Sequence, residues 1–206
     1  NLPYQKGTPF EGLPGNVYAS PDMVGAENYV RNWGRDSAVT HLTFGILFNL
    51  EQLFEKYNLP LDPERRFYLN SLKNEYEKYL DDFVNLTIVH QRQIAPFGVS
   101  SSVYEPDGTV IKVPWGLPQR DGPALRGLAL IVYAKSLYWK AESLQSSSLD
   151  IQTDETAKSQ LQLEAKNLIH KAKALWQDVI FNDIEHTAYH HRDSTFEPWE
   201  ETETFD

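Results

Sequence analysis

Apolar residues recur every three or four positions along several stretches of the chain, which is the spacing of an amphipathic α-helix. The first stretch follows Asp36 and Ser37, residue types that commonly cap a helix. The second begins at Asp62 and Pro63, a capping residue before a proline at the first helical position, and reaches about His90. The turn "NLPLDPE" separates these two predicted helices. Their apolar faces comprise Val39, Leu42, Ile46, Leu47, Leu50, Leu53, Phe54 and Tyr57, then Phe67, Leu72, Tyr76, Tyr79, Leu80 and Phe83.

The second half of the chain repeats this arrangement. A third helix is predicted to start after Asp121, Gly122 and Pro123 and to reach about Glu142. The polar segment "SLQSSSLD" is predicted to link it to the next helix. The fourth helix opens with the capping sequence "TDET" and is predicted to give way to loop at Asn182. The tryptophans of these two helices are predicted to lie in the core. The apolar positions concerned are Trp139, Leu161, Leu168, Trp176, Val179 and Ile180.

Residues 1–34 and 91–122 are rich in glycine and proline and are predicted to be loop, apart from a short hairpin at "EPDGT". The predicted architecture is therefore all-α, with two αα-hairpins and little strand. A cluster of polar and aromatic residues precedes the first helix ("NYVRNWGRDS"), the third ("WGLPQRDGP") and a possible fifth ("EPWEE"). In a ring of αα-hairpins every second helix lies inside, so we expect these clusters to meet at one end of the ring.

Composition narrows the class of ligand. The chain has 206 residues, enough for a single domain, and a formal net charge of −10, which argues against nucleic acid or an anionic membrane as partner. No cysteine is present, and no apolar stretch is long enough to cross a bilayer. The N-terminal residues lack the pattern of a signal peptide. One sequon, at Asn85, would accept a glycan in a secreted protein.

The three clusters combine tryptophans with charged side chains, as in Trp33 with Arg35 and Asp36. Indole rings offer apolar surface to the C–H face of a sugar, while arginine, aspartate and glutamine bind hydroxyls through directional hydrogen bonds. A sugar pocket is the function that these residue types favour. Arg-Asp dipeptides at helix starts also occur as caps and surface ion pairs, so that interpretation remains open. A metal site at His186, His190 and His191 is the weaker alternative because no complete ligand set accompanies them; we predict neither metal nor cofactor.

The motifs "NYVRNWGRDSAVT", "WGLPQRDGPALRG" and "EPWEE" resemble the glucoamylases of glycoside hydrolase family fifteen, above all the yeast type, where "GLPGNVYASP" also has a counterpart. The resemblance runs from about residue 2 to 201. It implies an (α/α)6 toroid and an exo-acting inverting hydrolase that releases β-D-glucose from the non-reducing ends of starch-like α-glucans. It also implies a secreted or vacuolar protein that is a monomer when full length.

The resemblance also implies roles for individual residues. Glu200 would be the general acid, and the charges of Glu197 and Glu201 beside Trp199 would raise its pKa, as an acid catalyst requires. Inversion also needs a carboxylate base about 6.5–9.5 Å from the acid, which the family carries downstream of the matching segment. The residues expected to bind or enclose the substrate are Tyr29, Trp33, Arg35, Asp36, Trp115, Arg120, Asp121, Glu197, Trp199 and Glu201.

Several positions depart from the family pattern. Leu117 stands where the family usually has a substrate-binding arginine, Gly34 replaces a larger residue, and the tail "TETFD" does not match. A twelve-helix toroid also needs roughly twice as many residues. We therefore expect residues 1–206 to be a single partial catalytic domain, the first half of the barrel, and inactive alone. The alternatives are a non-catalytic glucan-binding or regulatory module on the same fold and a hydrolase of another α-glucoside.

Overall fold

The computed structural model describes residues 2–3, 12–18, 31–93, 99–111, 121–151 and 154–189. Helices make up most of this part of the chain. In chain order, the elements are β1 (Leu2–Pro3), β2 (Val17–Tyr18), β3 (Asn32–Trp33), α1 (Gly34–Lys56), α2 (Pro63–Gln91), β4 (Val103–Tyr104), α3 (Asp121–Asp150), α4 (Glu155–Leu175), the π-helical segment η1 (Trp176–Ile180) and α5 (Phe181–Tyr189).

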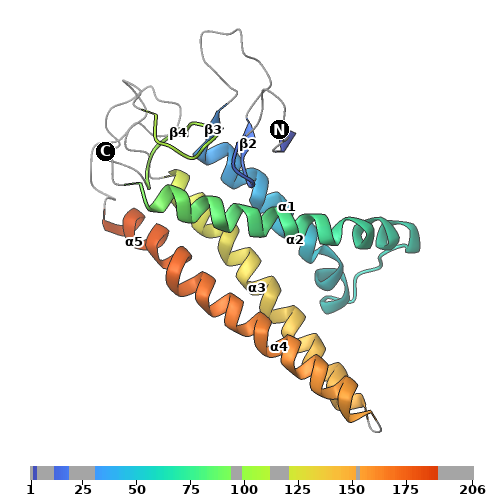
Figure 1. Ribbon diagram of the computed structural model, residues 1–206. Coiled ribbons are helices and arrows are strands. Elements are labelled where there is room, and N and C mark those ends of the chain that lie inside the picture. Colours follow the sequence, from blue (N-terminus) through green and yellow to red (C-terminus); the bar gives the residue numbers. More distant parts are fainter. Residues whose placement is uncertain are drawn as a thin grey trace.

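The helices form the two predicted hairpins, α1 with α2 and α3 with α4, and α1 packs against α3 to join them (Figure 1). The short strands lie at the end of the helices where α1 and α3 begin and α2 ends. The main core fills the space between the hairpins. Its largest fully buried members are Leu80, Phe83, Leu130, Tyr133, Leu137 and Ile180.

The capping signals read from the sequence locate the start of two helices correctly. Asp62 accepts a hydrogen bond from the backbone N–H of Arg65 at 2.9 Å, directly before α2. Asp154 accepts from Thr156 and Ala157 in the same way before α4. These side chains satisfy amides that have no partner in the first helical turn. The first helix differs, because α1 begins at Gly34 and its predicted caps lie within its first turn.

The turn after α1 is closed by backbone hydrogen bonds. Asn58 adopts a left-handed conformation with φ of 49°, and the N–H of Leu59 donates to the carbonyl of Phe54 at 2.8 Å. This combination is a Schellman motif, which terminates a helix. The predicted turn between the first two helices is therefore confirmed.

The predicted polar link after Glu142 is wrong, because α3 continues to Asp150. Serines 146 and 148 turn their hydroxyls back onto the helix, donating to the carbonyls of Glu142 at 3.0 Å and of Gln145 at 2.7 Å. Because their hydroxyls are hydrogen-bonded within the helix, these serines do not end it. Packing of α3 against α4 outweighs their weak helical preference.

The loop predicted from Asn182 is wrong as far as Tyr189, since α5 continues the helical path from η1 to that residue. The N–H of Phe181 donates to the carbonyl of Trp176, the hydrogen bond of a π-helical turn. Val179 and Ile180 in this segment are buried as predicted, but Trp176 is 46% exposed and is not a core residue. The buried positions Leu168, Ala172, Leu175 and Val179 keep a spacing of three or four residues, and Trp176 lies one position beside this face.

The part of the chain predicted to be loop before residue 34 contains strands. The order β1-β2-β3-β4 forms an antiparallel sheet in which Tyr18 pairs with Asn32 and Asn32 pairs with Tyr104. Each strand is two residues long, so none produces a visible alternation of apolar and polar positions. The predicted hairpin at "EPDGT" is confirmed: the N–H of Glu105 donates to the carbonyl of Thr109, and Gly108 has a φ of 84°.

Some residues of the predicted apolar faces are exposed. Phe67 is 76% exposed because every buried side chain of α2 lies in its second half, from Leu80 to His90; the first half extends beyond the neighbouring helices (Figure 1). Val39 and Ile46 point to a side of α1 that none of the described elements covers, and Tyr57 follows the end of that helix. Within the described ranges, no helix has the length and hydropathy needed to cross a membrane.

Candidate functional site

The junction of β3 and α1 carries the first polar-aromatic cluster. Trp33 ends β3, and Arg35 and Asp36 lie in the first turn of α1, all three partly exposed. The N–H of Gly34 donates to the carbonyl of Ser102 at 3.0 Å, and a Cβ at this glycine would lie 3.3 Å from the carbonyl oxygen of Ser101. A larger residue at position 34 would press on the chain that enters β4. Glycine here lets the two segments approach closely, and β4 thereby fixes the cluster.

The second cluster meets the first at Asp121, the first residue of α3. Nη1 of Arg35 lies 3.8 Å from Oδ2 of Asp121, and the two side chains are 32% and 22% exposed. Gly122 faces the backbone of Arg35, since a Cβ at this position would lie 4.0 Å from the Arg35 nitrogen. The N-terminal ends of α1 and α3 are therefore adjacent, as expected for alternate helices of a ring. Asp36 and Asp121 each place a carboxylate in the first turn of a helix, where the helix dipole stabilises it.

The other predicted site residues lie outside the described part of the chain. They are Tyr29, Trp115, Arg120, Glu197, Trp199, Glu200 and Glu201. Their roles stay predictions. His190 and His191 of the alternative metal site lie outside it as well. Residues 12–18, 31–93, 99–111, 121–151 and 154–189 contain no group of three or more histidine, cysteine, aspartate or glutamate side chains arranged to hold a metal.

Asn16 and Asn32 hold the segments around the first cluster together through hydrogen bonds, a role that the sequence did not predict. Asn16 donates through Nδ2 to the carbonyls of Leu13 at 2.9 Å and Pro106 at 2.5 Å, and its Oδ1 accepts from Asn32 at 2.8 Å. Both asparagines are buried. They connect residues 12–18 and the β4 hairpin to the strand that bears Trp33. Nothing in the sequence marks them, because asparagine in a glycine-rich segment is ordinarily a turn residue.

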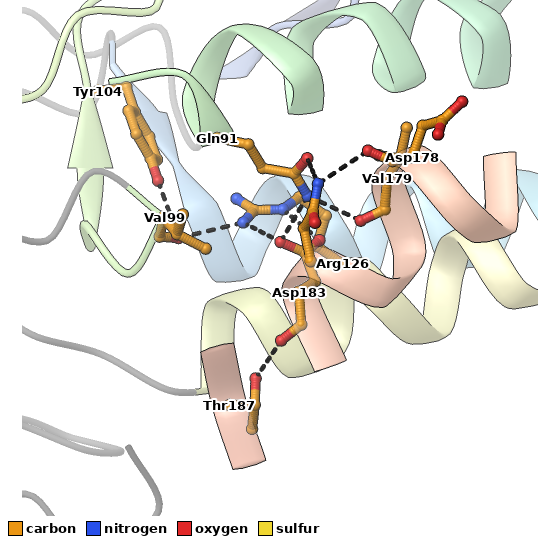
Figure 2. Close-up of polar contacts among 9 residues, drawn as sticks. Gln91, Val99, Tyr104, Arg126, Asp178, Val179, Asp183 and Thr187 are labelled. Carbon is orange, nitrogen blue, oxygen red and sulfur yellow. Dashed lines mark hydrogen bonds and ion pairs between the residues drawn. The ribbon is translucent and has the colours of Figure 1, made fainter. Parts of the chain in front are cut away.

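Arg126 on α3 and Asp183 on α5 form a buried ion pair (Figure 2). Nε of Arg126 donates to Oδ2 of Asp183 at 2.8 Å, and Nη2 donates to Oδ1 at 2.6 Å. Burial acts to lower the pKa of Arg126, but the charge and hydrogen bonds of Asp183, helped by Tyr104, outweigh it and raise the pKa above its usual value. The guanidinium is therefore a permanent cation.

Two neighbouring side chains complete this buried network. Gln91 donates to Oδ1 of Asp183 and to the carbonyl of Val179, both at 2.9 Å. The ring of His90 stacks on Tyr104 with centroids 3.6 Å apart, and burial together with the charge of Arg126 keeps the pKa of His90 well below its usual value. His90 is consequently neutral.

A sequence signal for Arg126 did exist. It is the only charged residue in the run "PALRGLALIVYA", where the helical pattern is otherwise apolar. A charge in such a run is either exposed or paired with an opposite charge, since an unpaired buried charge is very costly. Its partner is not predictable, because the chain has 29 acidic residues and Asp183 lies in a segment predicted to be loop.

Chemically, the junction suits a neutral polyhydroxyl ligand. It combines an indole with a guanidinium and two carboxylates, and all of these side chains are partly accessible. The arginine can donate to hydroxyl oxygens, and the carboxylates can accept from hydroxyl groups. Because the guanidinium of Arg35 lies beside the carboxylate of Asp121, hydrogen-bond donors and acceptors for hydroxyl groups are available at the same place.

Comparison with known proteins agrees with this geometry. The model of a family described as Glycosyl hydrolases family 15 matches residues 3–205. Glucoamylase GLA1 of Saccharomycopsis fibuligera is 27% identical over 205 residues, which are 98% of this chain and 34% of that protein. Glucoamylase P of Amorphotheca resinae is 30% identical over 188 residues, 91% of this chain and 24% of that protein. The chain thus spans about a third or less of these relatives' lengths.

Solved structures show the same relationship at the level of the fold. A glucoamylase from Saccharomycopsis fibuligera aligns over 98% of this chain and 36% of its own, with a TM-score of 0.62 and 24% identity. The Hormoconis resinae glucoamylase aligns over 92% of this chain and 26% of its own, with a TM-score of 0.56 and 26% identity. The helices described above therefore correspond to part of the (α/α)6 fold of glucoamylases, and the chain belongs to glycosyl hydrolase family 15.

Proposed function

We propose that the full-length protein is an exo-acting inverting glucan 1,4-α-glucosidase, which releases β-D-glucose from the non-reducing ends of starch-like α-glucans. The observation that carries the proposal is the Arg35–Asp121 contact at 3.8 Å, which brings together two motifs far apart in the sequence. Both motifs are among those that resemble the family, and both stand at helix N-termini on one side of the fold.

In this proposal the described residues bind the sugar and do not cleave it. Arg35 donates to a hydroxyl of the terminal glucose, and Asp36 accepts from a hydroxyl of the same ring. Trp33 covers an apolar face of the sugar. Asp121 orients the guanidinium of Arg35 through their ion pair, so that the donors are held in place before the substrate arrives.

Bond cleavage is assigned to the third motif. Glu200 donates a proton to the glycosidic oxygen, and a second carboxylate removes a proton from the water that attacks the anomeric carbon on the opposite face. The C–O bond to the leaving glucan breaks as the bond to water forms, which inverts the configuration. Trp115 and Trp199 form the sides of the pocket, and Tyr29 lies near the positive charge that develops on the sugar ring. The remaining site residues, Arg120, Glu197 and Glu201, contact the sugar or the residues that bind it.

The experiment is glucose release from maltose and from soluble starch by the full-length protein and by Glu200→Gln. We expect the wild type to release glucose as the β-anomer and the variant to lose about 1,000-fold in kcat, because an amide cannot donate the proton that the leaving oxygen needs. Glu185→Gln, at an exposed carboxylate on α5, is the matched control and should behave as wild type.

Three outcomes would contradict the proposal: no release by the wild type, an unaffected Glu200→Gln, or α-glucose as the first product. Calorimetry with maltose and turnover of other α-glucosides then separate the alternative functions. Binding without hydrolysis would support a glucan-binding module, and turnover of trehalose or isomaltose in place of maltose would support a hydrolase of another α-glucoside.

A further inference from the structure

Arg126 contacts several segments that together hold the Arg35–Asp121 pair, although it lies too deep to touch a ligand. It is 2% exposed. Besides its two hydrogen bonds to Asp183 on α5, its Nη2 donates to the carbonyl of Val99 at 3.1 Å (Figure 2). One guanidinium therefore joins α3, α5 and the chain that leads into β4.

The Val99 contact connects Arg126 to the first cluster. The hydroxyl of Tyr104, in β4, donates to the same Val99 carbonyl at 3.3 Å. Tyr104 pairs with Asn32 in β3, and β3 continues through Trp33 into α1. Each step along this path is a hydrogen bond, a strand pairing or the chain itself, so we expect a displacement of Val99 to shift the segment that bears Arg35 as well.

The second cluster is connected more directly. Asp121 begins α3, and Arg126 follows it by a little over one turn of the same helix. A helix is stiff over one turn, so fixing Arg126 fixes the end of α3 where Asp121 lies. The same side chain thus anchors both members of the ion pair, one through its own helix and the other through β4 and β3.

We propose that Arg126, held by Asp183, is a positioning residue that sets the spacing of Arg35 and Asp121 in the sugar site. The catalytic consequence rests on the proposed function; the positioning itself does not. An arginine suits this role because its planar fork binds a carboxylate with two N–H groups while a further N–H reaches a carbonyl. A lysine has a single nitrogen and cannot make these contacts in the same geometry.

Stability alone does not account for this ion pair. Replacing a buried ion pair with apolar residues of similar volume is often neutral or stabilising, because removing two charges from water costs as much as their attraction returns. A fold that needed only stability could therefore place apolar side chains at both positions. An apolar pair would not make the hydrogen bond to Val99. Replacing the ion pair by an apolar pair therefore tests the positioning role.

Two variants of the full-length protein test it. Arg126→Lys keeps the positive charge opposite Asp183 but loses the fork. Arg126→Met/Asp183→Leu removes both charges and leaves the packing apolar. The control is Tyr133→Phe, which removes a buried hydroxyl that donates to Asp81 at 2.5 Å and accepts from Lys171 at 3.0 Å in another network of the core. All are assayed well below their Tm.

The first readout is backbone hydrogen exchange, which needs no enzymatic activity. We expect both Arg126 variants to exchange at least about 10-fold faster than wild type in residues 99–104 and 31–36, with residues 165–175 of α4 unchanged, because only the former segments depend on the Val99 contact. Tyr133→Phe should leave the 99–104 and 31–36 segments as in wild type. Wild-type exchange there in the folded double variant would overturn the proposal.

The second readout is kcat and KM for maltose. A displaced binding group weakens transition-state contacts, so we expect kcat/KM of the double variant to fall about 10- to 100-fold, and that of Arg126→Lys at least about 5-fold, with Tyr133→Phe within about 2-fold of wild type. Full activity in either Arg126 variant, or an equal loss in Tyr133→Phe, would refute a positioning role. Absence of turnover in the wild type would instead refute the proposed function, and the exchange measurement would still decide the positioning.

Discussion

The imidazole of His41 on α1 lies flat against the phenyl ring of Phe83 on α2, with the ring centroids 3.8 Å apart and the planes inclined by 4°. Nδ1 of His41 is 2.7 Å from the carbonyl oxygen of Ser37, so this nitrogen is the one that carries the proton in the neutral ring. Burial lowers the pKa of His41 from 6.5 to about 4, and the hydrogen bond to Ser37 only partly opposes this.

The stability of the protein should therefore depend on pH between about 4 and 6.5. In this range the unfolded chain binds a proton at His41 and the folded protein does not, so stability is complete above pH 6.5 and declines by about 3 kcal/mol as the pH falls to 4. His90, with its lowered pKa, acts in the same direction. Urea unfolding from pH 4 to 7.5 measures the slope, which His41→Phe should reduce. A slope in His41→Phe equal to that of wild type, or a reduced slope in the exposed-site control His170→Gln, would show that His41 is not the group responsible.

Replacing two different glycines by alanine should change stability in opposite directions. Gly15 has a φ of 88°, and a Cβ there would lie 2.5 Å from the carbonyl oxygen of Asp82, so Gly15→Ala should lower the free energy of unfolding by about 2 kcal/mol or more. Gly127 lies within α3, and its added Cβ would make ordinary contacts at 3.7 Å or more. Gly127→Ala should raise the free energy of unfolding by about 0.5–1 kcal/mol. Denaturant midpoints that shift in the same direction for both variants would contradict this.

Removing the amide of Asn16 should loosen the support beneath Trp33. Asn16→Ala leaves Nδ2 of Asn32 without its acceptor at 2.8 Å and the partly buried Pro106 carbonyl without its side-chain donor, which should cost about 2–3 kcal/mol. The control is Asn70→Ala, which removes an exposed hydrogen bond of 3.3 Å to Glu51 and should change the free energy of unfolding by less than about 0.5 kcal/mol. Chemical denaturation of both variants gives the comparison, and equal effects would argue against a supporting role for Asn16.

The Arg35–Asp121 pair should matter much more for activity than for stability. At 3.8 Å and with both side chains partly exposed, its contribution to stability is at most about 1 kcal/mol. If these groups hold glucose, Arg35→Met and Asp121→Asn should nevertheless each lower kcat/KM for maltose about 100-fold or more. Steady-state kinetics and unfolding curves on the same samples separate the two effects. Variants that lose stability and activity in parallel would point to a purely structural pair.

The helical frame was predictable where a local signal decides the conformation. Asp62 and Asp154 mark helix starts in the sequence. Each side-chain oxygen accepts a hydrogen bond from an amide of the first helical turn, and this interaction is favourable whatever the rest of the fold is. The α3 extension and α5 were missed for the opposite reason. The sequences of these segments have weak helical preference. Packing against other helices, α4 for the end of α3 and α3 for α5, holds them helical.

The site residues also divide into those that the sequence predicts and those that it does not. Arg35 and Asp121 were predicted to meet from the alternation of motifs along the helices, and the structure places them side by side. Asn16, Arg126 and Asp183 were missed because their roles depend on partners in other segments: Asn32, Val99 and Gln91. Such pairings carry no periodicity, so a single sequence does not reveal them.

The short strands also have a consequence for the order of folding. Helices α3 and α4 are joined by a short connection, so they can associate at little cost in chain entropy, whereas the sheet must bring Asn32 to Tyr104 across all of α1 and α2. We therefore expect the helical hairpins to form early and the four two-residue strands to pair late. The region that positions Trp33 and Arg35 would then be the last to assemble, and the first to open when the protein is warmed.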